Sequence, residues 1–219
     1  MNTTTPPRSS AGILAWPSWL LLAAALPLLS GCFGAAALGV GAGALMATDR
    51  RASETYVTDE SIELRAASRI RETFGNRVSV HVASFNRSIL LTGSAPDAAT
   101  RTELEKLASG VPNVRAISNE VEIGGTASYA DDAYITTKVK ARFIDGNKFA
   151  VNHVKVLTEG GAVYLLGLVT KREADAAVEI ARTTAGVRKV VRVFEYISEE
   201  QARLANSPPR ETKPAAAKP

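Results

Sequence analysis

The spacing of apolar positions divides the chain beyond residue 56 into two similar halves. In the first half, apolar residues recur every four positions from Ile62 to Ile70, and the same spacing returns in the second half from Ile135 to Phe143. Such a recurrence is typical of an amphipathic helix with one face in a core. The chain therefore predicts an internal repeat in which each copy opens on a helix.

Both copies continue with the same order of elements. Helices opened by the N-cap candidates Asp59 and Asp132 are followed by two strands joined by a turn, a second helix and a last strand. These four elements are expected at residues 79–82, 88–93, 97–109 and 114–123 in the first copy, and at 153–157, 162–167, 171–184 and 187–197 in the second. The sequence thus predicts an α+β fold of two domains, residues 57–124 and 131–198, each αββαβ with a three-stranded sheet packed against two helices.

One glycine occupies the same place in each copy. Gly93 and Gly167 both fall where the second strand is expected to end. Glycine at such a point indicates a bulge or a close approach of another element. We therefore expect both glycines to be structural.

The start of the chain has a different character. No charged residue occurs between Arg8 and Asp49, and residues 13–46 are almost all apolar or small. A weakly basic start, an apolar core over residues 20–29 and small residues before Cys32 are typical of a signal peptide, here residues 1–31. The alternative from the residues alone is a transmembrane helix that holds a free thiol.

Cys32 is the only cysteine, and the sequence Leu-Ser-Gly-Cys that it ends resembles a bacterial lipobox. That resemblance implies transfer of a diacylglyceryl group to the Cys32 sulfur and cleavage after Gly31. Residues 32–56 would then be a lipidated N-terminus and tether, and Phe33, in place of Asp, resembles lipoproteins passed on to the outer membrane. At the other end, residues 199–219 are rich in Pro, Ala and charge, which predicts a disordered tail.

The composition of the chain excludes several classes of function. The net charge of the 219 residues is only +4, which argues against a strongly basic nucleic-acid binder. One cysteine and two histidines leave little material for a metal site, and no catalytic motif is present. Asp131 and Asp132 precede a helix, where carboxylates typically cap. We expect no catalytic residue, metal or cofactor, although a carboxylate site between the domains stays open as an alternative.

A family resemblance follows from these motifs. The αββαβ order, the strands ending in LTG and LLG, and the stretch GVPNVRAISNEVEI resemble the BON domain. Two such domains behind a lipobox, with ATDRR in the tether and DDAYITTKVKARF opening the second copy, resemble outer-membrane lipoproteins with tandem BON domains. The resemblance implies a non-catalytic, periplasm-facing lipoprotein that supports envelope integrity, with the outer-membrane protein assembly machinery as a partner.

The first helix of the second copy is the candidate binding site. Tyr134, Lys138 and Ala141 lie away from the apolar stripe, with Thr137 at the edge of their face. Tyrosine suits a membrane–water interface, and lysine can extend toward phosphate. In the resembled family, binding of anionic phospholipid such as phosphatidylglycerol is attributed to this helix, with tryptophan where this chain has Tyr134. The alternative for Tyr134 is packing against the other domain.

Charge agrees with this assignment without deciding it. Residues 131–198 hold eleven Lys and Arg against eight Asp and Glu, whereas residues 57–124 hold eight against nine. Each cation near an anionic bilayer contributes roughly 1 kcal/mol, but ordinary surface variation explains the same excess. The rival hypothesis is a protein-interaction scaffold in which the first domain or an open sheet edge holds a partner and the lipid anchor is only an address.

The lipobox leads to a direct prediction. Mass spectrometry of the protein purified from its native membrane should find Cys32 at the N-terminus, carrying acyl adducts. Recovery of an unmodified peptide that continues through residues 1–40 would contradict lipidation and favour the transmembrane alternative.

Overall fold

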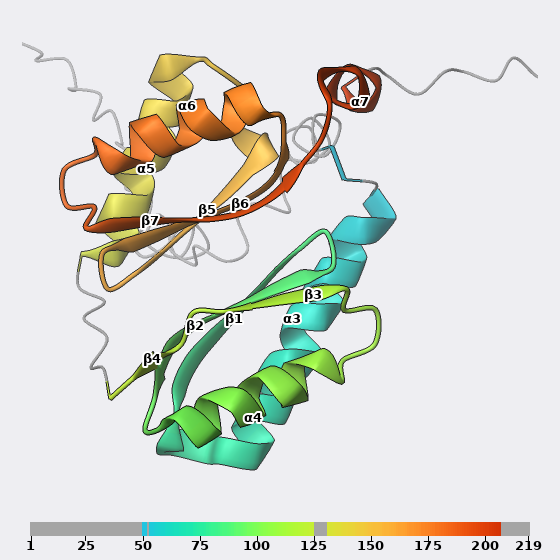
Figure 1. Cartoon of the computed structure of the whole chain (residues 1–219), viewed down its shortest axis with the longest axis vertical. Coiled ribbons are helices and arrows are strands. Elements are labelled where there is room, and N and C mark those ends of the chain that lie inside the picture. Colours follow the sequence, from blue (N-terminus) through green and yellow to red (C-terminus); the bar gives the residue numbers. More distant parts are fainter. Residues whose placement is uncertain (1–49, 52, 125–130, 207–219) are drawn as a thin grey trace, which may run out of the picture. The chain divides into compact units, whose positions relative to one another are not determined.

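Each repeat folds in the predicted order of helix, two strands, helix and strand, as the computed structural model shows for residues 50–51, 53–124 and 131–206 (Figure 1). The elements of the first repeat are α3 (Ser53–Phe74), the 3-10 turn η1 (Gly75–Arg77), β1 (Ser79–Phe85), β2 (Ser88–Ala95), α4 (Ala98–Ser109), β3 (Ala116–Asn119) and β4 (Glu122–Ile123). Those of the second are α5 (Asp132–Gly146), η2 (Val151–His153), β5 (Val154–Glu159), β6 (Ala162–Val169), α6 (Lys171–Arg182) and β7 (Lys189–Tyr196), and α7 (Glu199–Ala205) follows. The predicted α+β fold of two αββαβ units is confirmed.

The two sheets share one topology. In each, the hairpin strands are antiparallel and the last strand pairs in parallel with the second, which gives the orders β1-β2-β3 and β5-β6-β7. The last strand of the first repeat is interrupted where Val121 turns into the core, at 2 % exposure, so β3 and β4 pair with β2 separately. The strand β7 is continuous.

The helices of each repeat cover one face of its sheet (Figure 1). In the first repeat the predicted stripe of Ile62, Ala66 and Ile70 packs on Ile89 and Leu91 of β2. The equivalent core of the second repeat contains these residues: Ile135, Val139, Phe143, Val163 and Leu165. All of them are at most 4 % exposed, so each repeat has its own apolar core.

The opposite faces of the two sheets share a third cluster. Phe85 and Leu90 of the first repeat lie in one buried group with Tyr164 and Leu166 of the second. The two repeats accordingly belong to one compact unit. Burial, reinforced by nearby glutamates, raises the pKa of Tyr164 to about 12, so its phenol stays protonated near neutral pH.

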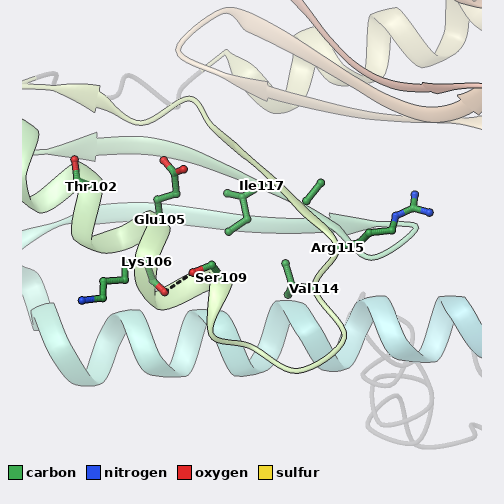
Figure 2. Close-up of a pocket in the computed structure, with 8 residues that line it drawn as sticks. Thr102, Glu105, Lys106, Ser109, Val114, Arg115 and Ile117 are labelled. Atoms are coloured by element: carbon green, nitrogen blue, oxygen red, sulfur yellow. Dashed lines mark hydrogen bonds between the residues drawn. The ribbon is translucent and has the colours of Figure 1, made fainter.

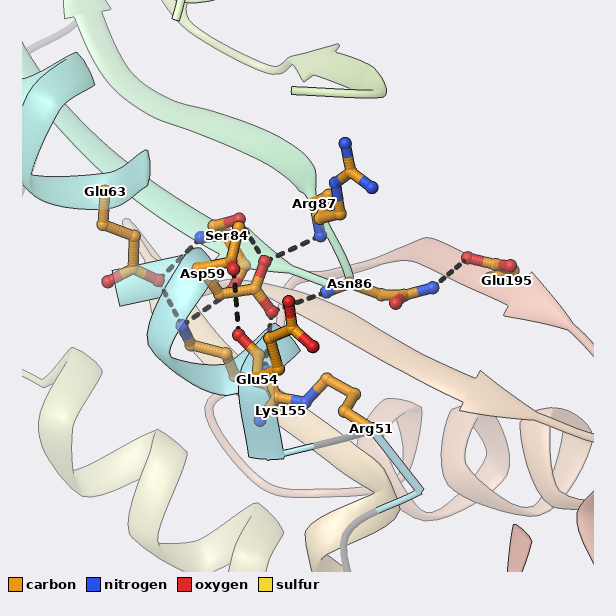
Figure 3. A network of polar contacts seen from close by, with 10 residues as sticks. Arg51, Glu54, Asp59, Glu63, Ser84, Asn86, Arg87, Lys155 and Glu195 are labelled. Atoms are coloured by element: carbon orange, nitrogen blue, oxygen red, sulfur yellow. Dashed lines mark hydrogen bonds and ion pairs between the residues drawn. The ribbon is translucent and has the colours of Figure 1, made fainter. Parts of the chain in front are cut away.

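Polar contacts also join the two repeats (Figure 3). The Lys155 ammonium lies 2.5 Å from a Glu63 carboxylate oxygen, and the Asn86 side-chain amide donates to Glu195 at 2.7 Å. An apolar centre with a polar rim is the usual anatomy of a specific interface. The apolar faces left free by the helices are therefore used to join the repeats.

The structure corrects the role predicted for Asp59. The helix α3 begins at Ser53, so Asp59 lies inside it and is no N-cap. Its carboxylate, 2 % exposed, accepts the backbone N–H groups of Asn86 and Arg87 at 2.8 and 2.7 Å and the Ser84 hydroxyl at 2.7 Å (Figure 3). It therefore binds the hairpin turn between β1 and β2.

The second repeat contains the same arrangement. Asp131 is at the N-cap position of α5 but makes no side-chain capping bond, and Asp132 accepts the N–H groups of Gly160 and Gly161 at 2.7 and 2.8 Å. The capping prediction is therefore wrong for these aspartates as well. The hairpin turn explains why Asp132 bonds there. Its two residues, Gly160 and Gly161, have positive φ angles of 55° and 76°, which gives a type I′ turn. The successive N–H groups of such a turn need an acceptor, and Asp132 provides it.

The predicted disordered tail is wrong for its first part. Residues 199–205 form α7, which is opened by a capping box in which the Ser198 and Gln201 side chains each bond the other's backbone. Ala202 on its inner side is only 4 % exposed. The proline-rich remainder, residues 207–219, lies outside the described residues, as does Cys32.

Gly93 and Gly167 lie in β2 and β6, two residues before each strand ends. A Cβ added to Gly167 would stand 2.4 Å from the His153 carbonyl oxygen, and one added to Gly93 would stand 2.0 Å from that of Ser79. Gly93 also has φ +108°, which side chains rarely adopt. Both positions bring neighbouring backbone too close for a side chain.

We expect Gly167→Ala to destabilise the protein by about 1–3 kcal/mol, because backbone must move to admit the methyl group. Urea denaturation of a soluble fragment of residues 50–206 measures this. Gly110→Ala is the matched control, since φ there is negative and the nearest atom is the end of the Arg69 side chain, 3.3 Å away. Equal stability of the two variants would contradict the packing argument.

Candidate functional site

The helix α5 is fixed on its domain by contacts on three sides. On its inner face, Val139 and Phe143 are fully buried in the core. The Thr136 hydroxyl is 2.7 Å from that of Thr158 on β5, and Arg142 donates to the Ile180 carbonyl on α6 at 2.9 Å. Because these contacts set its rotation, the outward face of α5 is a constant feature of the surface.

The four residues predicted to form the site are on that outward face. Tyr134 is 64 % exposed, Thr137 and Ala141 are exposed, and Lys138 is partly buried. Ile144, 63 % exposed, extends the same face and was not among the predicted residues. Its position three residues after Ala141 and seven after Thr137 is the helical spacing that would have indicated it.

Lys138 and Tyr134 form a unit on this face. The Lys138 ammonium lies 4.4 Å from the centre of the Tyr134 ring, a cation–π contact, and donates a hydrogen bond to the Ala185 carbonyl at 2.5 Å. The lysine is thus held beside the ring and does not extend freely. Since an ammonium has three N–H donors, it can still donate to a phosphate placed above the helix.

The basic side chains near this face are of two kinds, exposed lysines and an arginine that is bonded within the domain. Lys140 and Lys148 are exposed. Arg142 is committed to the Ile180 carbonyl and to the Thr184 hydroxyl, at 2.7 Å. Of the basic neighbours, the lysines are therefore the ones available to an anionic ligand.

The first repeat provides an internal comparison. In α3, the positions equivalent to Tyr134, Ala141 and Ile144 are Ser61, Ser68 and Arg71. Exposed Leu64 stands where α5 has Thr137, but the aromatic side chain has no counterpart. The helix α3 also exposes large side chains, Tyr56 at 43 % and Leu64 at 66 %, but it contains no lysine. The property that distinguishes α5 is therefore the placement of an exposed aromatic and an exposed aliphatic residue beside lysines.

A groove in the first repeat is the second candidate. It lies between α4 and the start of β3, encloses about 530 Å³, and is lined by the following residues: Thr102, Glu105, Lys106, Ser109, Val114, Arg115, Ala116 and Ile117 (Figure 2). The Ser109 hydroxyl donates to the Lys106 carbonyl at 2.8 Å, so it is held as part of the helix end. The lining offers no nucleophile beside a base, and β3 is the edge strand of its sheet.

Within residues 50–51, 53–124 and 131–206, no three His, Cys, Asp or Glu side chains come together as a metal site would need. Among those same residues, no helix combines the length and the hydropathy required to cross a membrane.

Comparison with known proteins agrees with this architecture. The family model described as "BON domain" matches residues 58–125 and 131–198. The chain is 35 % identical over 183 residues to "Outer membrane lipoprotein DolP" of Haemophilus influenzae, covering 81 % of this chain and 94 % of that protein. It is 34 % identical over 154 residues to "21 kDa hemolysin" of Actinobacillus pleuropneumoniae, covering 68 % and 79 %. It is 30 % identical over 117 residues to "Osmotically-inducible protein Y" of Escherichia coli, covering 51 % and 58 %.

Two matched repeats and a relative aligned over nearly its whole length establish the family: the chain belongs to the BON-domain proteins. More particularly, it is an outer-membrane lipoprotein with two BON domains, of the DolP type.

Proposed function

We propose that this lipoprotein binds anionic phospholipid, such as phosphatidylglycerol, through the outward face of α5. The observation that carries the proposal is the pair of large exposed side chains, Tyr134 and Ile144, on a helix whose inner face is packed in the core and whose outer face also holds lysines. Exposing such side chains to water is unfavourable, and a rigid helix cannot turn them inward. A membrane interface accommodates both the apolar atoms and the tyrosine hydroxyl.

The chemistry of binding has an apolar and an electrostatic part. Tyr134 and Ile144 would insert at the level of the headgroups, while Lys138, Lys140 and Lys148 attract phosphate, each contributing about 1 kcal/mol near an anionic surface. The lipid expected on Cys32 would place α5 beside a bilayer at high effective concentration, so a weak headgroup contact suffices. The protein faces the periplasm, works without catalysis and supports the integrity of the envelope.

A second candidate function is docking of a protein segment by the first repeat. The groove between α4 and β3 favours it, because an extended peptide can pair with an edge strand while its side chains enter such a groove. In this role the protein would be an envelope scaffold, with the outer-membrane protein assembly machinery as partner. The lipid anchor would then serve only to localise the protein at the membrane.

Vesicle binding by the soluble fragment of residues 50–206 separates the two functions. Tyr134→Ala should weaken binding to phosphatidylglycerol vesicles about tenfold, since losing the burial of a tyrosine ring costs about 1.4 kcal/mol or more. Ile144→Ser should act in the same direction. Binding should also fall as salt rises, because exposed charges are screened over roughly 10 Å at 0.1 M.

The control is the equivalent position in the first repeat. Ser61→Ala alters the matching site on α3 and should leave vesicle binding unchanged. Circular dichroism establishes that each variant is folded. Folded Tyr134→Ala that binds vesicles as tightly as the parent would refute lipid binding through α5 and favour the docking function.

A further inference from the structure

Two consecutive arginines of the tether are buried against different repeats. The Arg50 side chain is 3 % exposed and contacts the second repeat, and the Arg51 side chain is 8 % exposed and contacts the first. Arginine is rarely buried to this extent unless its charge is paired, because removing it from water is costly. These two residues therefore occupy built sites.

The acceptors around Arg50 match a guanidinium group. Its Nη1 and Nη2 atoms donate to the two carboxylate oxygens of Glu173 at 2.7 and 2.8 Å, in a bidentate pair. Nη1 also donates to the Leu168 carbonyl at 2.9 Å, and Nε donates to the Asn206 side-chain oxygen at 3.0 Å. Four of the five N–H donors of the group are thus bound. We call Glu173, the Leu168 carbonyl and Asn206 the guanidinium pocket.

The pocket is oriented by its own domain. Glu173 is in the first turn of α6, where it forms a capping box with Thr170 and accepts the Thr170 N–H at 2.9 Å. Burial alone would raise the pKa of Glu173, but hydrogen bonds from Arg50 and Thr170 outweigh it and hold the pKa below its ordinary value. The carboxylate is therefore ionised at neutral pH when it binds the guanidinium group, and the bond to Thr170 holds it in place.

Arg51 has an equally defined site on the first repeat. Its guanidinium donates to Asp59 at 2.9 Å and lies over the Phe85 ring, 4.1 Å from the ring centre. Asp59 also binds the hairpin turn of that repeat, and Phe85 belongs to the cluster that the repeats share. Arg51 therefore contacts the first repeat at the point where it meets the second.

We propose that the second repeat carries a binding site for an arginine side chain, the guanidinium pocket, and that its ligand is the tether of the same chain. With Arg51 bound to Asp59, the Arg50-Arg51 pair forms a two-arginine clamp across the junction of the repeats. Because adjacent residues hold opposite repeats, the clamp ties the tether to both at once.

The clamp fixes where the membrane anchor leaves the folded unit. Without it, the tether would continue directly into α3 of the first repeat; with it, the tether is bound at the second repeat first. At no more than about 3.5 Å per residue, the chain between Cys32 and Arg50 can reach at most about 60 Å, which limits how far the guanidinium pocket can lie from the lipid anchor.

Thermal unfolding of the full mature chain, purified in detergent, tests the pocket. Arg50→Gln should lower the Tm by about 5–10 °C, the range expected when one partner of a buried ion pair is removed from a domain of this size. Arg182→Gln is the matched control, because Arg182 pairs with Glu179 on the exposed surface of α6 at 60 % exposure, and it should shift the Tm by no more than about 2 °C.

The decisive measurement adds a free ligand. N-acetylarginine methylamide at millimolar concentration should restore part of the lost Tm in Arg50→Gln and not in the parent protein, while N-acetyllysine methylamide should restore none. Glu173→Gln, which keeps the capping box, should abolish that rescue. Equal Tm values for Arg50→Gln and Arg182→Gln would overturn the clamp. A fall in Tm that the arginine probe does not reverse would overturn the guanidinium pocket.

Discussion

The second face of each small sheet has to be covered, and this constraint governs the structure. Two helices cover one face of three strands, which leaves Phe85 and Leu90 in the first repeat and Tyr164 and Leu166 in the second without partners from their own domain. At about 25 cal/mol per Å² of apolar surface, exposing those side chains would cost several kcal/mol. The repeats bury these side chains by packing the two sheets against each other. With one face of each sheet under its helices and the other against the partner repeat, neither face is left for a ligand.

The paired sheets decide which surfaces remain for function. The outer faces of the helices stay in contact with solvent, and the two repeats differ there even though their cores correspond. The face of α5 carries Tyr134 and Ile144, whereas the matching positions of α3 carry Ser61 and Arg71. Duplication thus supplies two similar scaffolds, of which the one whose helix holds Tyr134 beside lysines is specialised for lipid in our proposal. The buried aspartates, Asp59 and Asp132, keep the hairpins of both scaffolds in the same geometry.

Much of the fold could be predicted from the sequence because its signals are local. The helical stripes, the hairpin turns and the order of elements all depend on residues close together in the chain, and the outward position of Tyr134 follows from the same period. The apolar run Ile89-Leu90-Leu91 also indicates that β2 is covered on both faces, because a strand that is apolar on both faces is typically buried on both.

The features that the sequence did not reveal depend on partners far along the chain. Asp59 has the appearance of a helix cap until the turn at Asn86 is placed beside it, and Arg50 has the appearance of a linker residue until Glu173 is found opposite. The helix α7 has a local signal, because the capping box of Ser198 and Gln201 can be recognised in the sequence. Only the hydrogen bond from Arg50 to Asn206 at its end depends on a distant partner. Ile144 could also be placed from the sequence, because its helical period puts it on the candidate face.

Lipid contact through α5 is tested most directly by locating the bilayer on the protein. The soluble fragment of residues 50–206, labelled with nitrogen-15, can be added to phosphatidylglycerol nanodiscs that contain a spin-labelled lipid. The amide signals of Tyr134, Ala141 and Ile144 should be attenuated, and those of Ser61 and Ser68 on α3 should not. Attenuation centred on the groove between α4 and β3, or none beyond that seen with phosphatidylcholine nanodiscs, would contradict lipid binding by α5.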